Sequence, residues 1–221
     1  NQLFRVIGQK ARQNPKHVVF AEADNPKVLK AAQICLEEKI CYPILLGEER
    51  RISQIAMQNG LDLSGMVIID PKNEQFEEKR REFGELFFAM RGRKGYNRYE
   101  AIKAMKDRVH FGCMMVKTGE ADAVITGPSR DYSGLIRPAL QTIGMEDGVK
   151  KIAGMCILLT KTGQLFLADA TVNLNPTAEE IADIALLVAK EVRSFNLKPR
   201  IALLSYSNFG SSPTPEARMM A

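Results

Sequence analysis

Serine, arginine and glycine gather in two stretches of this chain, and each stretch follows an apolar run. The first is GPSRDYSGLIR at residues 127–137, and the second is SYSNFGSS at residues 205–212. Hydroxyls, guanidinium groups and the backbone N–H groups of glycine-rich loops bind phosphate and other anions. If both apolar runs are strands, both loops follow a strand's carboxyl end, which is where open α/β sheets bind ligands. We therefore expect both loops to supply donors to an anion, with Ser129, Arg130, Tyr132, Ser207, Gly210 and Ser211 lining a ligand cleft.

The first stretch also has a purely structural interpretation. Asp131 could cap the helix that follows and leave Arg130 in water. Arg137 lies about two helical turns beyond Arg130, on nearly the same face. Both interpretations remain open from the residues alone.

A third stretch, RGRKG at residues 91–95, places three cations beside two glycines. Arg91, Arg93 and Lys94 could bind phosphate, because guanidinium donors match phosphate oxygens in pairs. Cations are also common at the carboxyl end of a helix, where they interact favourably with its dipole. This stretch is therefore a candidate phosphate site or an ordinary helix end.

Acidic side chains follow two further apolar runs: Glu22 and Asp24 follow the first, and Asp169 follows a later one. A carboxylate at the end of a sheet can act as a general base or cap the next helix. The GxGxxG fingerprint, the GxxxxGK[ST] loop and the GxSxG elbow are all missing from the sequence. Four cysteines without a CxxC pair and two histidines indicate neither zinc nor disulfides.

Composition is ordinary for a water-soluble protein of 221 residues with a formal net charge of +5. Basic and acidic residues alternate along the helices, which argues against binding nucleic acid. No run approaches the ~20 apolar residues that cross a bilayer, and there is no signal-peptide pattern. We expect a cytoplasmic protein with reduced thiols. The chain starts without methionine and stops as a helix begins, so we expect it to be a piece of a longer polypeptide.

Short β-rich runs alternate with amphipathic stretches of ten or more residues from residue 17 to residue 90. This order predicts a three-layer α/β/α fold with a mostly parallel sheet. Asn25 with Pro26, and Asn175 with Pro176, predict two helix starts. A turn at residues 161–163 predicts a hairpin inside the parallel pattern. We place a boundary near residue 148, with one α/β subdomain at 1–148 and a second at 149–221 that is incomplete at its carboxyl end.

Eight segments in order resemble the phosphate acetyltransferase/butyryltransferase family, and together they span almost the whole chain. They are FAEADN (20–25), PILLG (43–47), HFGCMMV (110–116), GEAD (119–122), RPALQ (137–141), ADA (168–170), NPT (175–177) and LSYS (204–207). The resemblance implies an isocitrate dehydrogenase-like fold of two α/β subdomains, a coenzyme A cleft between them and a homodimer or higher homo-oligomer. It also implies that Arg91 and Arg137 bind the phosphates of the coenzyme.

Within that family the chain is most similar to the hybrid NADP-dependent malic enzymes, which append such a domain to a dehydrogenase. RKGYNRYEA (93–101) and SNFG (207–210) resemble that branch, and residues 129–132, SRDY, replace the small threonines of true transferases. The resemblance implies a non-catalytic domain that binds acetyl-CoA or CoA, regulates the malic enzyme and assembles the oligomer. NADP and a divalent metal would belong to the amino-terminal malic enzyme part, with no cofactor in this domain.

Two other functions stay open. The chain could be an active phosphate acetyltransferase, which moves an acetyl group between CoA and phosphate, or a purely structural dimerisation module. The family's closing serine–arginine and aspartate motif lies beyond Ala221, so no catalytic residue is assigned.

Overall fold

A computed structural model describes residues 2–161, 163–207 and 211–220. The fold divides into two compact units. The larger unit is Gly8–Gly144, and the smaller unit combines Met145–Ala221 with Asn1–Ile7. Helix α1 (Gln2–Gln13) begins in the smaller unit and ends in the larger one.

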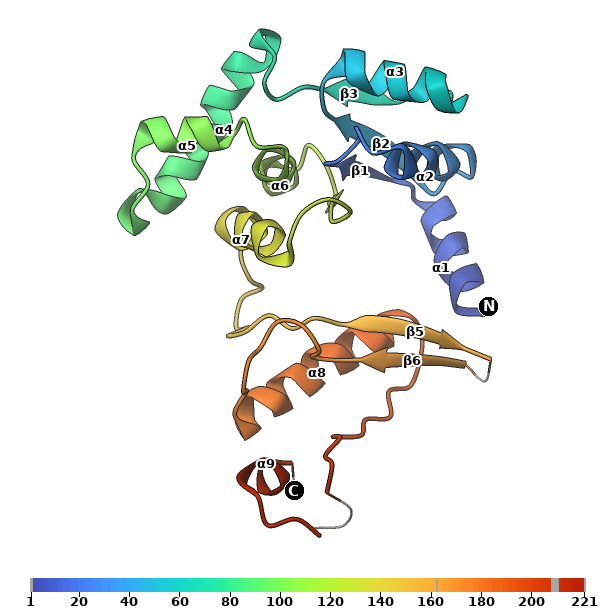
Figure 1. Cartoon of the computed structure of the whole chain (residues 1–221), viewed down its shortest axis with the longest axis vertical. Coiled ribbons are helices and arrows are strands. Elements are labelled where there is room, and N and C mark those ends of the chain that lie inside the picture. Colours follow the sequence, from blue (N-terminus) through green and yellow to red (C-terminus); the bar gives the residue numbers. More distant parts are fainter. Residues whose placement is uncertain (1, 162, 208–210, 221) are drawn as a thin grey trace. The chain divides into compact units, whose positions relative to one another are not determined.

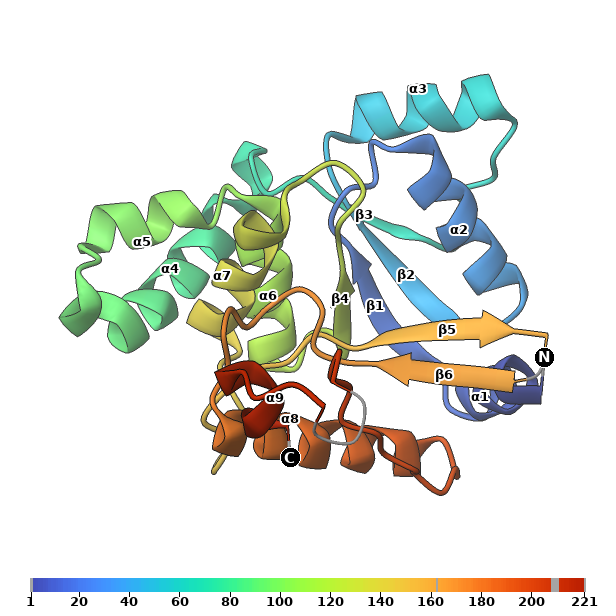
Figure 2. The ribbon, with the colours of Figure 1, turned by 60° about the horizontal axis from the view of Figure 1, so that its bottom comes forward.

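The larger unit contains a sheet of four parallel strands in the order β3-β2-β1-β4, which Figure 2 shows side by side. Val18 lies opposite Pro43 on one neighbouring strand and Ala123 on the other. The predicted parallel sheet is therefore confirmed. The strands are β1 (Lys16–Phe20), β2 (Cys41–Leu46), β3 (Val67–Ile69) and β4 (Ala123–Ile125).

Figure 1 shows helices on both faces of this sheet. Both faces need cover because apolar side chains alternate between them along the strands. Phe20 and Leu45 pack on one side with α2 and α3, while Val19, Ile44 and Leu46 pack on the other with α4, α5 and α6. This arrangement confirms the three-layer α/β/α prediction. The helices are α2 (Pro26–Glu37), α3 (Glu49–Asn59), α4 (Glu77–Arg91), α5 (Arg98–Ala104), α6 (Arg108–Thr118) and α7 (Tyr132–Thr142), with 3-10 turns η1 (Glu74–Phe76) and η2 (Gly92–Lys94).

The helix starts follow the sequence signals with one correction. Asn25 accepts from the Lys27 N–H at 2.9 Å, and Pro26 is the first residue of α2, as predicted. Helix α8 (Ala178–Ser194) is capped by Thr177 instead of Asn175, because Thr177 and Glu180 form a reciprocal capping box. The predicted cap was therefore two residues too early.

The smaller unit contains the predicted hairpin, formed by β5 (Cys156–Thr160) and β6 (Gly163–Leu167), together with α8 and α9 (Pro215–Met219). The strand predicted before residue 205 is wrong. Leu203 is 51% exposed and Leu204 76% exposed, and neither lies in a strand. An apolar run becomes a strand only when it pairs with another, and within the described residues β5 and β6 pair only with each other and not with this run.

Candidate functional site

The loop after β4 contains the first predicted anion-binding stretch, and its donors bind an anion of the protein itself. The carboxylate of Glu22, which follows β1 and is 4% exposed, accepts from the N–H groups of Gly127 at 2.7 Å and Ser129 at 2.9 Å. It also accepts from the hydroxyls of Thr126 at 2.8 Å and Ser129. These donors are therefore already bound to an internal anion, and ligand binding by this loop stays a prediction.

Glu22 is charged at neutral pH. Burial raises the pKa of its carboxyl group, but the hydrogen bonds from Ser129, Gly127 and Thr126 lower it below the ordinary value. A carboxylate with depressed pKa and four donors is a poor proton acceptor. Glu22 therefore holds the loop.

A second carboxylate, Asp107, holds the far end of the same loop. Its Oδ1 caps α6 by accepting from the N–H groups of Val109 and His110 at 3.1 Å, and its Oδ2 accepts from Arg130 Nη1 at 2.7 Å. Burial raises the pKa of Asp107, yet the hydrogen bonds from His110 and Arg130 hold it far below its usual range. Arg130 is thus bound by an ion pair, contrary to the interpretation that leaves it in water. Asp131 stands at the N-cap position of α7, as predicted, but it forms no side-chain capping hydrogen bond.

Sequence reasoning missed Asp107, although a signal was present. An aspartate directly before an apolar run of helical length is a typical N-cap. The ring of His110 lies between this carboxylate and Gln141, with Nδ1 3.2 Å from Asp107 Oδ1 and Nε2 3.4 Å from Gln141 Oε1. Tyr96 donates its hydroxyl to the same Gln141 oxygen at 3.2 Å. These contacts connect the turn before α5, which contains Tyr96, with α6 and α7.

The two predicted coenzyme ligands are both associated with α7. Arg91 is the last residue of α4 and contacts α7, and Arg137 is part of α7. Arg91 donates from Nε to the Gln141 carbonyl at 2.8 Å and from Nη2 to the Leu140 carbonyl at 2.6 Å. Arg137 lies on α7 itself, is exposed, and forms no hydrogen bond or ion pair with any residue that the structure describes. Arg91 therefore holds the carboxyl end of α7, while the guanidinium of Arg137 is available to a ligand. Phosphate binding by either remains a prediction.

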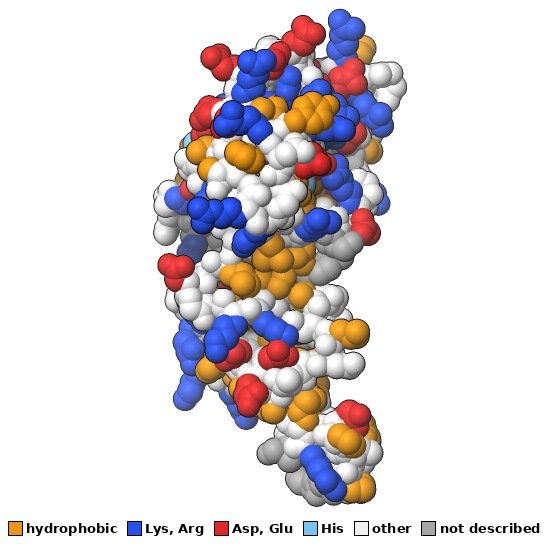
Figure 3. Space-filling model, turned by 90° about the vertical axis from the view of Figure 1, so that its left-hand side faces the viewer, with side chains coloured by type: hydrophobic (Ala, Val, Ile, Leu, Met, Phe, Trp, Pro, Cys, Tyr) orange, Lys and Arg blue, Asp and Glu red, His pale blue; other side chains and the backbone are white. Residues whose placement is uncertain are grey.

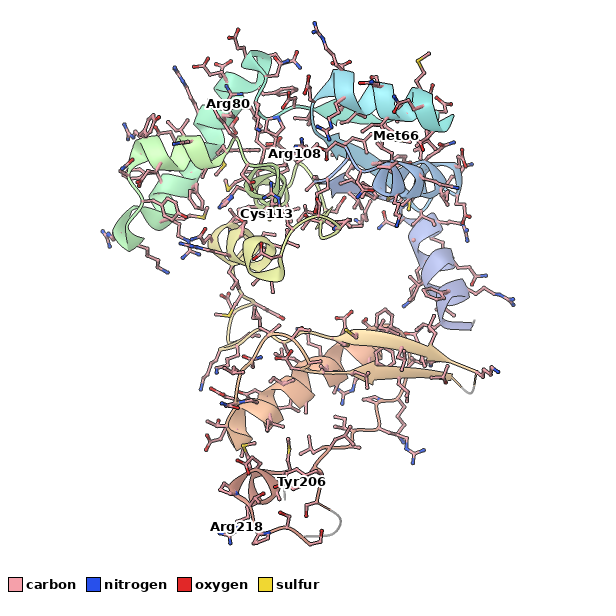
Figure 4. The ribbon with its side chains drawn as sticks, viewed as in Figure 1. Met66, Arg80, Arg108, Cys113, Tyr206 and Arg218 are labelled. Atoms are coloured by element: carbon pink, nitrogen blue, oxygen red, sulfur yellow. The ribbon has the colours of Figure 1, made fainter. Side chains whose placement is uncertain are left out.

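A cavity of about 500 Å³ lies between α6, β4 and α7. Its lining is mainly apolar, and Cys113 on α6, labelled in Figure 4, belongs to it. The polar contribution comes from the loop after β4. The lining residues are Val109, Cys113, Val124, Thr126, Gly127, Arg130, Leu135, Ile136 and Ala139.

The remaining predicted site residues are Tyr132, Ser207, Gly210 and Ser211. Tyr132 is the first residue of α7, and its side chain lies outside the described part. Gly210 also lies outside the described residues. Ser207 accepts from the Ser212 N–H at 3.1 Å in the smaller unit, where Ser211 is exposed. A cleft that these residues share with Ser129 and Arg130 stays a prediction.

Asp169, considered as a base, is a loop-holding residue. Its Oδ1 accepts from the N–H groups of Gly154 and Val172 at 3.1 Å and of Thr171 at 3.2 Å, and its Oδ2 accepts from Asn173. Burial raises its pKa, but the bonds from Asn173 and the backbone set the pKa at about 2. Such a group is a weak base near pH 7.

Three further observations concern nucleic acids, metal ions and membranes as partners. Figure 3 shows Lys and Arg side chains interspersed with Asp and Glu on the face it presents. Over the described residues no group of three or more His, Cys, Asp or Glu side chains is placed to hold a metal ion. No helix in the same part of the chain is long and apolar enough to cross a membrane.

Comparison with known proteins identifies the family. The model of the phosphate acetyl/butaryl transferases matches residues 2–221. The chain belongs to this family. The resemblance seen in the sequence is therefore confirmed.

Two kinds of transferase-family relative match this chain. The NADP-dependent malic enzyme of Escherichia coli (strain K12) is 35% identical over all of the chain and 29% of its own length. The phosphate acetyltransferase of Thermoanaerobacterium thermosaccharolyticum is 37% identical over 95% of the chain and 65% of its own length. The solved EutD phosphotransacetylase from Staphylococcus aureus superposes with a TM-score of 0.87 at 26% identity, over 99% of this chain and 65% of that one. The chain thus spans less than two thirds of these relatives.

Proposed function

We propose that this chain is a phosphotransacetylase-like domain that binds acetyl-CoA or CoA and regulates a malic enzyme to which it is joined. The observation that carries the proposal is the exposed guanidinium of Arg137, which has no partner among the described residues and lies on the helix whose end Arg91 holds. An exposed, unpaired arginine on a rigid helix suits the phosphates of a coenzyme. The match to malic enzymes across the whole chain supports the joined arrangement.

Regulation would operate by linkage. Acetyl-CoA inhibits the joined enzyme only if it binds more tightly to the less active arrangement of the oligomer. The domain would supply the effector site and contacts between copies. The malic enzyme part would hold NADP and the divalent metal.

Calorimetric titration with acetyl-CoA and CoA tests the proposal. We expect saturable binding to the folded chain, weakened about tenfold by Arg137→Ala, which corresponds to about 1.4 kcal/mol. Arg50→Ala is the matched control, because Arg50 is exposed on α3, on the opposite face of the sheet. Absence of binding, together with a melting temperature that neither ligand raises, would refute the proposal.

The second candidate function is phosphate acetyltransferase activity. It is favoured by the 37% identity to a phosphate acetyltransferase and the TM-score of 0.87 to a phosphotransacetylase. The reaction would transfer the acetyl group of acetyl phosphate to the CoA thiol, with release of phosphate. Formation of acetyl-CoA from acetyl phosphate and CoA by the full-length natural protein would establish this activity.

A further inference from the structure

The loop at residues 126–129 lines one side of the cavity and also donates hydrogen bonds to the Glu22 carboxylate. Thr126 and Gly127 line the cavity, and each donates to Glu22 Oε1, at 2.8 Å and 2.7 Å. Ser129 donates to Oε2 from both its backbone and its hydroxyl. Each carboxylate oxygen therefore accepts two hydrogen bonds, and these bonds hold the loop at residues 126, 127 and 129.

The position of Glu22 is itself fixed by the sheet. The Ala21 N–H donates to the Ile125 carbonyl at 3.0 Å, which extends the pairing of β1 with β4 by one residue. The next residue, Glu22, is 4% exposed. A buried charge is tolerated only where it is fully hydrogen-bonded, so the loop and the carboxylate stabilise each other.

The cavity suits one end of a thioester. An acyl group is a short apolar chain with a single carbonyl oxygen, and the lining offers Val109, Cys113 and Leu135 with Arg130 at the polar side. Ile136 and Ala139 also line it, and they lie on α7 next to Arg137. Arg137 is on the same helix but on a different face, because residues one or two apart in a helix do not face each other, so a ligand bound to Arg137 must pass around α7 to enter the cavity.

Resting on the proposed function, we infer that Glu22 is a positioning residue, which holds the loop at residues 126–129 in the shape that lets the cavity receive the acyl end of a CoA thioester. Glu22 does not touch the ligand. Its contribution is to keep Thr126, Gly127 and Ser129 turned towards the sheet. Without that carboxylate, the N–H and hydroxyl donors of these residues would turn towards the cavity and make it narrower or its lining more polar.

The consequence is a separation of two affinities. The nucleotide end would be held by Arg137 and would not depend on Glu22. The acyl end would depend on the loop. Loss of Glu22 should therefore weaken acetyl-CoA binding much more than binding of CoA, which lacks the acyl group. A role in stability alone would leave this ratio unchanged.

The test is calorimetric titration of the whole chain with acetyl-CoA and with CoA, in wild type and in Glu22→Gln. The amide keeps the shape but removes the charge and turns N–H groups towards the loop's own donors. We expect the Kd for acetyl-CoA to rise at least tenfold and the Kd for CoA to change less than threefold. Glu48→Gln, at an exposed position without a side-chain capping bond, is the matched control and should leave both unchanged.

Ser129→Ala provides a milder variant if Glu22→Gln does not fold, because it removes one hydroxyl donor to Glu22 at a residue that does not line the cavity. It should shift the two affinities in the same unequal way, by about threefold for acetyl-CoA. Equal losses for both ligands, or unchanged binding of both, in a folded variant would overturn the inference. If wild type binds neither ligand, the proposed function fails and this inference fails with it. Binding of CoA by wild type with an unchanged ratio in the variants would overturn the role of Glu22 alone.

Discussion

Arg130 Nη1 lies 2.7 Å from Asp107 Oδ2, and this ion pair joins the loop after β4 to the amino end of α6. The same carboxylate caps α6 through its other oxygen. A ligand that drew Arg130 away from Asp107 would therefore leave the cap in place. The loop keeps one fixed end at Glu22 and has one exchangeable end at Arg130.

The two functions of Asp107 can be separated by substitution. Asp107→Ala removes the helix cap, the ion pair and the contact with the His110 ring, and loss of a cap alone costs about 0.5–2 kcal/mol. Arg130→Gln removes only the ion pair of a side chain that is 39% exposed, which contributes about 0–1 kcal/mol. Denaturant unfolding should show the larger loss for Asp107→Ala. Equal losses would mean that the cap contributes nothing.

Thiol reactivity should follow burial. Cys113 and Cys41 are 1% and 5% exposed, and burial raises their pKa to about 11 and about 12, so neither forms a reactive thiolate near neutral pH. Cys156 is exposed. A thiol reagent such as Ellman's should label Cys156 first, and Cys156→Ser should remove that fast phase. Rapid labelling of Cys113 in the native protein would contradict the packing of α6.

Gly84 permits the close approach of α4 and α5. A Cβ built there would lie 2.7 Å from the Cα of Ile102 and 2.6 Å from its Cγ1, so Gly84→Ala must push the helices apart at a cost of about 1–3 kcal/mol. Gly8→Ala is the control, since its Cβ would meet only the flexible guanidinium of Arg12. That change should be neutral or stabilising by up to about 1 kcal/mol. Similar unfolding midpoints for the two variants would contradict the packing.

The parallel sheet and the three layers were predictable from the alternation of β-rich and amphipathic runs, and the hairpin was predictable from the turn at residues 161–163. Val19 and Phe20 are adjacent in sequence and pack on opposite faces of the sheet. Asn25 and Pro26 mark the start of α2 by residue type alone. The failures share a different cause. Leu203 and Leu204 are apolar, but whether they form a strand depends on a neighbouring edge far away in the sequence.

The candidate site was predicted only in part for the same reason. The donors of residues 126–129 were recognisable, whereas their partner, Glu22, lies more than a hundred residues earlier in the chain. The sequence likewise located Arg91 but could not show that α7 supplies the carbonyls it binds. Residue type predicts what a group can bind, and tertiary structure decides whether an internal partner already occupies it.

Acid should destabilise the smaller unit through Asp169. Its folded pKa of about 2 lies below the ordinary value of about 3.9, so the unfolded chain binds more protons between these values. The stabilisation is therefore fully present above about pH 5 and is lost as the pH falls towards 2. Asp169→Asn should be less stable at pH 7 and lose less on acidification. Unfolding by denaturant at pH 7, 5, 4 and 3 measures this, and parallel curves for both proteins would contradict it.

Arg91 and Arg137 should differ in what their loss affects. Arg91→Ala leaves the carbonyls of Leu140 and Gln141 without their donor, and hydrogen bonds from a charged donor contribute about 1.5–3 kcal/mol. Arg137→Ala removes an exposed side chain that has no partner among the described residues, so stability should change by no more than about 0.5 kcal/mol. Denaturant unfolding and acetyl-CoA titration on both variants would separate folding from binding.

Arg91→Lys sharpens the comparison, because a single ammonium keeps the charge but cannot match the fork of two guanidinium nitrogens on two carbonyls. If Arg91 mainly holds α7, the lysine variant should lose stability nearly as the alanine variant does. Any weakening of acetyl-CoA binding would then follow from displacement of α7, and hence of Arg137. If Arg91 mainly binds phosphate, the lysine variant should retain much of the affinity that the alanine variant loses. Stability unchanged in both variants would show that the two carbonyl bonds do not hold α7.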